Sequence, residues 1–187
     1  MPSIAPDRAG VNSVRLRGPA GRGRGLERRD GKVARYGWND VRLLILGAGW
    51  LTGEIAARAV AGGDDVTCLA RGKTSAATSG ATFVRADRDD PDAYDAIAGM
   101  HWDAVVDIST HPQRVRRAVH ALQPNAQHCI YVSSASVYVD DRTPNQDESA
   151  QTHEPVEDGE PSDPELYGAH KVACERIVAS ADRKSVV

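Results

Sequence analysis

The sequence of 187 residues contains no long hydrophobic run. Its longest aliphatic stretch is Leu43 to Leu46, whereas a helix that crosses a bilayer needs about 20 apolar residues. The basic first 40 residues contain no apolar stretch followed by a cleavage site, which a secretory signal requires. These absences argue against a membrane-spanning or exported protein, and we expect a cytoplasmic one.

Cysteine is scarce, with only three residues in the chain. Cys68, Cys129 and Cys174 are widely spaced and form no C-x-x-C pair, so we expect buried, reduced thiols. The six histidines form no pair at i, i+4, and none joins a cysteine at zinc-ligand spacing. The sequence therefore predicts no metal site.

The charge is unevenly distributed along the chain. Residues 1–40 hold nine of the 23 basic residues and four of the 26 acidic ones, and they include the stretch Gly21 to Gly25, where glycine and arginine alternate. So few apolar residues cannot offset the entropy of ordering, which predicts a disordered leader. Arginine-rich leaders can bind nucleic acid, but no aromatic residues alternate with these arginines. We favour a misassigned upstream start codon.

From residue 41 onward, apolar runs of strand length alternate with helical patterns. A long acidic, aperiodic segment, Asp140 to Pro164, separates the last strand from the last helix and is interpreted as a functional surface loop. The predicted strands are 41–46, 66–69, 82–84, 103–108 and 129–133, and the predicted helices are 50–60, 91–98, 112–122 and 165–180.

This alternation predicts one α/β domain over residues 41–181, built on a doubly wound parallel sheet. Ligands of such sheets bind at the carboxyl ends of the strands. Gly47, Gly49 and Gly53 lie between the first strand and its helix, where glycines let the backbone approach a pyrophosphate. A tight strand–helix joint is the alternative interpretation of these glycines.

The end of the second strand offers no carboxylate for the ribose hydroxyl of NAD. Arg71 stands there instead and can pair with a 2′-phosphate, which favours NADP over NAD as the cofactor. An exposed arginine without a partner is the other interpretation.

Two further segments carry candidate chemistry. Tyr167 and Lys171 are four residues apart, so both project from one face of the last helix, where a nearby ammonium favours the phenolate. Many solvated helices show the same spacing. Ser133 to Ser136 follow the fifth strand at its carboxyl end, and they either bind a reacting oxygen or cap turns.

Together these motifs resemble the extended branch of the short-chain dehydrogenase/reductase family, the NAD(P)-dependent sugar-nucleotide epimerases, dehydratases and reductases. The resemblance covers residues 41 to about 180. It implies that Tyr167 is the catalytic acid/base, that Lys171 lowers its pKa and binds ribose, and that Ser134 orients the substrate. The implied cofactor-binding residues are Gly47, Gly49, Trp50, Leu51, Gly53, Arg71, Asp87 and Lys171.

The resemblance also implies a small-molecule substrate, specifically a nucleotide sugar, and a homodimer in the full-length parent. One departure is Trp50, which occupies the middle-glycine position of the family loop. Family members continue with a carboxyl-terminal substrate domain, so we expect this chain to be an incomplete fragment, and the sequence leaves open whether the fragment is active or inactive. The last six residues, 182–187, match a translated sequencing adapter and are interpreted as a non-native tail.

A non-catalytic function is the competing hypothesis. Trp50 and the basic leader favour a dinucleotide sensor or scaffold, or a relative that binds nucleic acid. The combination of Ser134, Tyr167 and Lys171 favours an enzyme instead.

Overall fold

The structure is a computed structural model that describes residues 41–72, 78–140, 142–159 and 163–181 in full, and residues 27–29, 32–34 and 185–186 by their backbone. The chain divides into two units, Met1–Asn39 and Asp40–Val187.

The first unit contains a short antiparallel hairpin of β1 (Glu27–Arg29) and β2 (Lys32–Ala34). The register of the hairpin is carried by backbone pairing, without an apolar period. The disorder predicted for residues 1–40 stays a prediction. The other residues of the leader lie outside the described residues.

The second unit is built on a six-stranded sheet in the order β5-β4-β3-β6-β7-β8, in which every neighbouring pair is parallel. This order confirms the predicted doubly wound fold, because the chain builds outward from β3 in one direction and then returns to extend the sheet from β6. The strands are β3 (Arg42–Leu46), β4 (Asp65–Ala70), β5 (Thr82–Arg85), β6 (Trp102–Asp107), β7 (Ala126–Tyr131) and β8 (Ser185–Val186).

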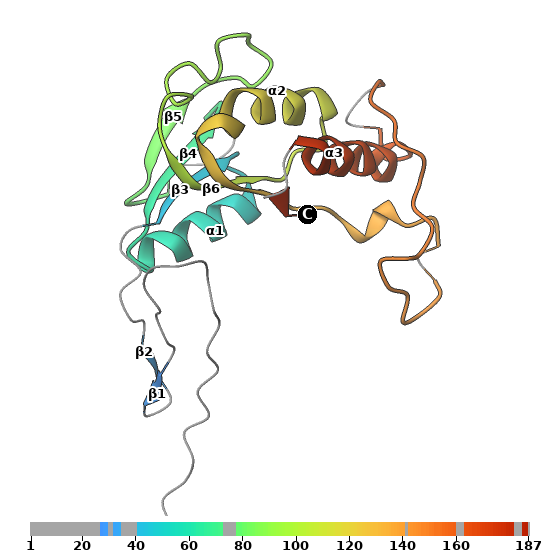
Figure 1. Ribbon diagram of the computed structural model, residues 1–187, viewed down its shortest axis with the longest axis horizontal. Coiled ribbons are helices and arrows are strands. Elements are labelled where there is room, and N and C mark those ends of the chain that lie inside the picture. The colour runs from blue at the N-terminus through green and yellow to red at the C-terminus, as the bar shows by residue number, and fades with distance from the viewer. Residues whose placement is uncertain are drawn as a thin grey trace, which may run out of the picture. The chain divides into compact units, whose positions relative to one another are not determined.

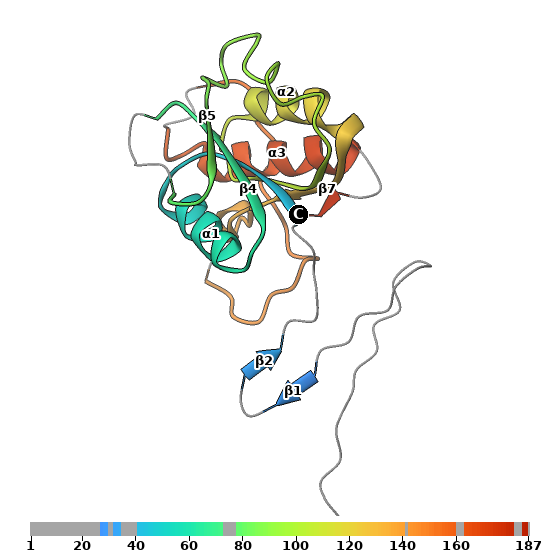
Figure 2. The same ribbon diagram turned by 90° about the vertical axis from the view of Figure 1, so that its left-hand side faces the viewer.

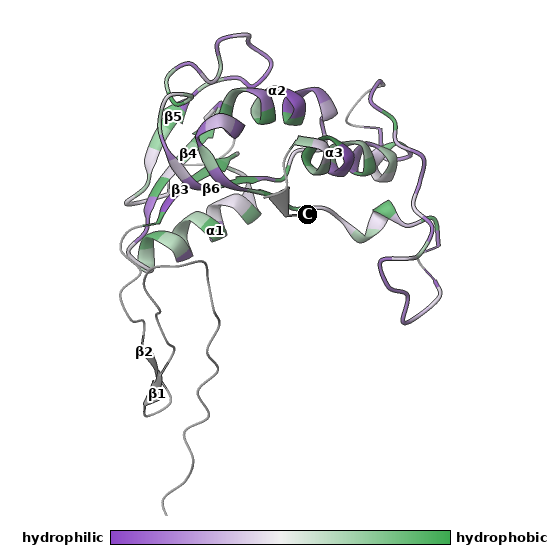
Figure 3. Cartoon of the chain, viewed as in Figure 1, coloured by the Kyte–Doolittle hydropathy of each residue, from purple (hydrophilic) through white to green (hydrophobic). Residues whose placement is uncertain are grey.

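Helices cover both faces of the sheet. α1 (Trp50–Ala61) lies on one face, and α2 (Pro112–Leu122) and α3 (Tyr167–Ala181) lie together on the other (Figures 1 and 2). α2 is amphipathic and buries its inner residues, as its alternating colours in Figure 3 show. α3 is buried on most of its circumference, since six consecutive residues from Ala169 to Cys174 are buried. Two short 3₁₀ turns, η1 (Gln123–Asn125) and η2 (Ala135–Val137), flank β7.

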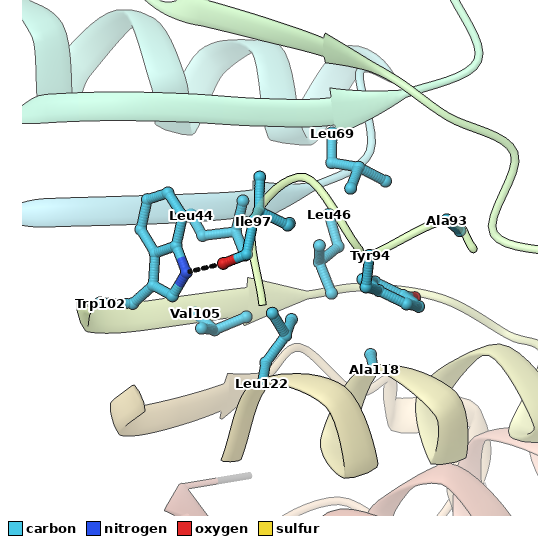
Figure 4. Packing of buried hydrophobic residues seen from close by; sticks show 10 residues of the cluster. All are labelled: Leu44, Leu46, Leu69, Ala93, Tyr94, Ile97, Trp102, Val105, Ala118 and Leu122. Atoms are coloured by element: carbon cyan, nitrogen blue, oxygen red, sulfur yellow. Dashed lines mark hydrogen bonds between the residues drawn. The ribbon is translucent and has the colours of Figure 1, made fainter. Parts of the chain in front are cut away.

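The hydrophobic core lies on both faces of the sheet, because successive side chains of β3 point to opposite faces. Leu44 and Leu46 pack toward α2, in the cluster that Figure 4 draws. Leu43 and Ile45 pack toward Ala56 of α1 on the opposite face.

Residues 91–98 do not form the helix that the sequence predicted. The segment is instead a series of turns, in which the amide of Asp95 donates to the carbonyl of Asp92 (3.1 Å) and that of Ile97 to Tyr94 (2.9 Å). Aspartates and Pro91 favour turns at this point because carboxylates compete for backbone amides. The indole of Trp102 then fastens the segment by donating to the carbonyl of Ile97 at 3.2 Å (Figure 4).

The last strand comes from the predicted tail. Ser185–Val186 pairs with Cys129 and Ile130 of β7, so it extends the sheet beyond β7. The non-native origin of residues 182–187 stays a prediction, and residues 182–184 and 187 lie outside the described residues.

Two of the three thiols are buried, as predicted, and none of these three cysteines, all within the described residues, forms a disulfide. Burial raises the pKa of Cys68, and it raises the pKa of Cys174 to about 11. Cys129 is half-buried on β7. In the described part of the chain, none of the helices has the length and apolar character that crossing a bilayer requires.

The turn segment contributes to stability through Ile97, whose side chain is 1% exposed. Ile97→Ala is expected to lower the free energy of unfolding by about 2–4 kcal/mol, because it removes buried methyl groups and leaves a cavity. Ile130→Ala is the matched control, since Ile130 is 37% exposed, and it is expected to cost less than about 1 kcal/mol. Urea unfolding measures both values, and equal losses would contradict this packing.

Candidate functional site

A cavity of about 240 Å³ opens at the carboxyl ends of four strands. It is lined by residues 46–49 after β3, 69–72 after β4, 86–88 after β5 and 108–109 after β6, together with Arg114 of α2. The centre of this edge lies between β3 and β6, where the strand order reverses. Such a switch point is where open α/β sheets bind ligands.

The turn between β3 and α1 is shaped for an anion. Gly47 has a φ of 133°, which side-chain-bearing residues rarely adopt, and its amide donates to the carbonyl of Leu69 at 2.9 Å. Gly49 is the N-cap of α1 and has no side chain to occupy the first amides, and no acidic residue stands in the first turn. The hydroxyl of the buried Thr52 donates to the carbonyl of Gly49 at 3.1 Å. The positive end of α1 therefore faces the cavity without a protein cap.

Trp50 does not fill the cavity, although the sequence places it at a glycine position of the family loop. Its side chain is 87% exposed, so the indole lies in solvent beside the turn. No atom lies within 4 Å of the position that a Cβ on Gly53 would take. Among the predicted loop residues, Gly47 and Gly49 line the cavity, whereas Trp50, Leu51 and Gly53 do not.

Arg71 has a partner, which removes the interpretation of an isolated exposed arginine. Its guanidinium lies 3.9 Å from the carboxylate of Asp87, and both residues line the cavity. Asp87 in turn accepts the amide of Asp89 at 3.2 Å. The two side chains are 46% and 31% exposed, so the pair is accessible to a ligand.

Beneath this pair lies a buried ion pair that sequence reasoning missed. Arg88 donates two hydrogen bonds to Asp107, at 2.9 and 2.5 Å, and a third from Nε to the hydroxyl of Tyr94 at 2.8 Å. Burial lowers the pKa of Arg88, but Asp107 outweighs that effect and raises it above its ordinary value. The only signal for this pair in the sequence was Asp107, a carboxylate at the end of a buried strand.

Lys171 is buried, with 2% of its surface exposed. Its ammonium donates to the carbonyls of Val132 (2.6 Å) and Ile108 (3.5 Å) and lies 4.3 Å from the ring centroid of Tyr131. Burial lowers the pKa of Lys171. The ammonium is thus held at the carboxyl ends of β6 and β7.

Tyr167 is the first residue of α3 and is half-buried. Its hydroxyl forms no hydrogen bond with any other residue that the structure describes, and the proximity of the phenol to the Lys171 ammonium stays a prediction. The catalytic roles of Tyr167 and Lys171 stay predictions.

Ser134 caps the η2 turn, as one of the two sequence interpretations expected. Its hydroxyl accepts the amide of Ser136 at 3.2 Å and donates to the Ser136 hydroxyl at 3.2 Å. α3 approaches this turn so closely that a Cβ on Gly168 would overlap the carbonyl oxygen of Ser136. Gly168 therefore brings the serine segment against the first turn of the helix that carries Tyr167.

In the described residues, no group of three or more His, Cys, Asp or Glu side chains is arranged to hold a metal ion. The family model for the NAD dependent epimerase/dehydratase family matches residues 43–187. The chain belongs to this family. The resemblance inferred from the motifs is therefore confirmed.

Solved structures share the fold of this chain. UDP-galactose 4-epimerase has a TM-score of 0.59 and 17% identity over 74% of this chain and 50% of its own. A Methylobacillus flagellatus protein described as an NAD-dependent epimerase/dehydratase has a TM-score of 0.57 and 26% identity over 78% and 52%. WbmG from Bordetella bronchiseptica, solved with NAD and UDP, has a TM-score of 0.59 and 16% identity over 77% and 51%.

The chain thus spans about half the length of these structures. A comparison with curated proteins found no match.

Gly168 provides a test of the close approach between α3 and η2. Gly168→Ala is expected to lower the free energy of unfolding by about 1–3 kcal/mol, because the new methyl group meets backbone that cannot move away easily. Gly53→Ala is the matched control in the first turn of α1, where the added Cβ meets open space and helix propensity favours alanine by about 1 kcal/mol. Thermal and urea unfolding measure both. A neutral Gly168→Ala would refute the close approach.

Proposed function

We propose that the chain is the dinucleotide-binding part of an NAD(P)-dependent enzyme that oxidises or reduces a hydroxyl or keto group of a nucleotide sugar. The observation that carries this proposal is the cavity at the switch point between β3 and β6, which the uncapped N-terminus of α1 and the Arg71–Asp87 pair both line. Family membership supports the same reaction class.

The residues at the cavity fit a dinucleotide. The turn from Gly47 to Gly49 leaves room and backbone donors for a pyrophosphate, and Asp87 and Arg71 stand at the end of β4 and β5 where adenosine would lie. A nicotinamide dinucleotide supplies a hydride acceptor or donor when it is bound. The chain itself supplies the positive end of α1 and the charged side chains of Arg71 and Asp87.

Proton transfer is assigned to α3 and the serine segment. The hydroxyl of Tyr167 has no hydrogen bond to a described residue, so it is available to a substrate oxygen. Lys171 adds a buried positive charge four residues further along the same helix, which favours the phenolate of Tyr167. Ser134, packed near this helix through Gly168, is proposed to orient the substrate oxygen.

A nucleotide sugar is the proposed substrate class. UDP-galactose 4-epimerase and WbmG, the latter solved with NAD and UDP, share the fold. The choice among epimerase, dehydratase and reductase depends on the groups that contact the sugar.

Arg71 tests the cofactor preference. Because a 2′-phosphate forms charge-assisted hydrogen bonds with a guanidinium, Arg71→Ala is expected to weaken NADPH binding about tenfold or more, equivalent to about 1.4 kcal/mol, and to leave NADH binding nearly unchanged. Arg58→Ala is the control, since Arg58 is an exposed α1 arginine paired with Glu54. Calorimetric titration measures each affinity. Equal effects on both cofactors would show that Arg71 does not select NADP.

Tyr167 tests the catalytic assignment. In the full-length parent, Tyr167→Phe is expected to reduce turnover of UDP-sugars by at least about 100-fold, because general acid–base catalysis is lost, while NADPH binding stays intact. Tyr138→Phe, a half-buried tyrosine beside the η2 turn, is the control and should retain activity. Cofactor absorbance follows turnover. Full activity in Tyr167→Phe would overturn the assignment, and dinucleotide binding with no turnover of any nucleotide sugar would favour a sensor.

A further inference from the structure

The buried ion pair beneath the cavity is part of a larger hydrogen-bond network. Arg88 and Asp107 are 8% and 6% exposed. Besides its bonds to Asp107 and Tyr94, Arg88 donates to the backbone carbonyl of Arg114 at 3.1 Å. The carboxylate of Asp107 is therefore fixed by a guanidinium that is itself fixed from three directions.

Asp107 also holds the backbone that follows it. One of its carboxylate oxygens accepts the amide of Ser109 at 2.9 Å, which closes a short turn around Ile108 at the end of β6. The carbonyl of Ile108 accepts from the ammonium of Lys171, and the carbonyl of Ser109 accepts from the hydroxyl of Tyr131 at 2.7 Å. The turn thus presents acceptors to two buried side chains at once.

Those two side chains are in contact with each other. The ammonium of Lys171 lies over the ring of Tyr131, 4.3 Å from its centroid. Among the described residues, Lys171 forms no ion pair, and its hydrogen-bond acceptors are the neutral carbonyls of Val132 and Ile108. A buried ammonium needs both acceptors and a compensating charge.

The groups that act on Lys171 come from three elements. Burial lowers the pKa of Lys171, and it is opposed by Cys174 and Glu175 on α3 and by Asp107 on β6, while Tyr131 of β7 contributes its ring. Cys174 is completely buried, and burial raises its pKa to about 11, so its thiol is neutral at physiological pH. Asp107 is therefore the carboxylate buried in the core with Lys171.

We propose that Asp107, clamped by Arg88, is the positioning residue for Lys171. It holds the turn at residues 107–109, and that turn fixes the Lys171 ammonium over Tyr131 at the carboxyl ends of β6 and β7. The same turn lines the dinucleotide cavity, so one carboxylate sets both the wall of the cavity and the place of the buried cation. The inference rests on the proposed function for the role of Lys171 in catalysis, but the geometry is a property of the chain alone.

A purely structural ion pair would stabilise the fold without affecting Lys171. The titration of the Lys171 ammonium separates the two cases, because only the positioning role predicts a change at that one nitrogen. The chain has four lysines, at positions 32, 73, 171 and 184, so a sample labelled with ¹⁵N at lysine Nζ gives few signals. Lys171→Arg assigns the relevant one.

The test variant is R88M/D107L, which removes both charges of the pair together, so that neither Arg88 nor Asp107 is left in the core without its partner. Asp107 raises the pKa of Lys171, whereas Arg88 is not among the groups that act on it. The Lys171 titration midpoint is therefore expected to move to lower pH in this variant, while the other three lysines do not move. Asp103→Asn is the control on the same strand, because Asp103 is half-exposed and accepts the amide of Arg42. It should leave all four lysines unchanged.

A second variant covers the case in which R88M/D107L does not fold. R88M/D107N keeps a side-chain oxygen for the amide of Ser109 and removes only the charges, and it is expected to move the Lys171 midpoint in the same direction. An unmoved Lys171 midpoint in either folded variant overturns the proposal. If neither double variant folds, a Lys171 midpoint in wild type that equals those of the other three lysines overturns it, and a lower one supports it.

Titration of the same wild-type sample with NADPH keeps this inference separate from the proposed function. Absence of NADPH binding together with a shifted Lys171 would defeat the proposed function and leave Asp107 as a positioning residue. NADPH binding with an unmoved Lys171 would defeat the role of Asp107 alone.

Discussion

The buried pair of Arg88 and Asp107 is the interaction on which the arrangement of the site depends. Removing one member of such a pair typically costs about 3–5 kcal/mol, because the other charge is left in the core without a partner. The segment after β5 and the end of β6 must therefore stay together whenever the domain is folded. Asp87 lies next to Arg88, and Ser109 lies two residues after Asp107, so two walls of the cavity are fixed by the same contact.

The parallel sheet explains why these residues meet although they are far apart in the chain. All carboxyl ends lie along one edge, and the reversal of strand order between β3 and β6 leaves a crevice there. α1 begins at that crevice with a glycine cap, which leaves its first amides available to an anion. α3 begins on the opposite side and is held against the serine segment by the missing side chain of Gly168. The Lys171 ammonium is held at the same edge by the carbonyls of Ile108 and Val132.

The local pattern of apolar residues was sufficient to predict most of the strands and helices. The apolar runs predicted β3, β4, β5, β6 and β7, and Pro112 marked the start of α2. The segment 91–98 was predicted wrongly as a helix, because its apolar spacing is satisfied equally well by consecutive turns held by Trp102. The aspartates and Pro91 favour turns locally, and the tertiary contact of Trp102 with Ile97 holds them in place.

The site was less accessible from sequence than the fold. Motif position placed Gly47, Gly49, Arg71 and Asp87 at the cavity, because residues that follow parallel strands converge at one edge. The pairing of Arg88 with Asp107 spans 19 residues and two elements, so no spacing rule predicts it. Helical spacing put Tyr167 and Lys171 on one face, but it does not specify where a long side chain ends.

The central claim is that the N-terminus of α1 receives the pyrophosphate of a nicotinamide dinucleotide. Amide ¹H–¹⁵N chemical shifts of the chain, recorded as NADPH is added, test it most directly. The account predicts the largest changes at Gly47, Gly49 and Trp50, with a second group at Arg71 and Asp87. Changes confined to other surfaces, or none at millimolar NADPH, would contradict it.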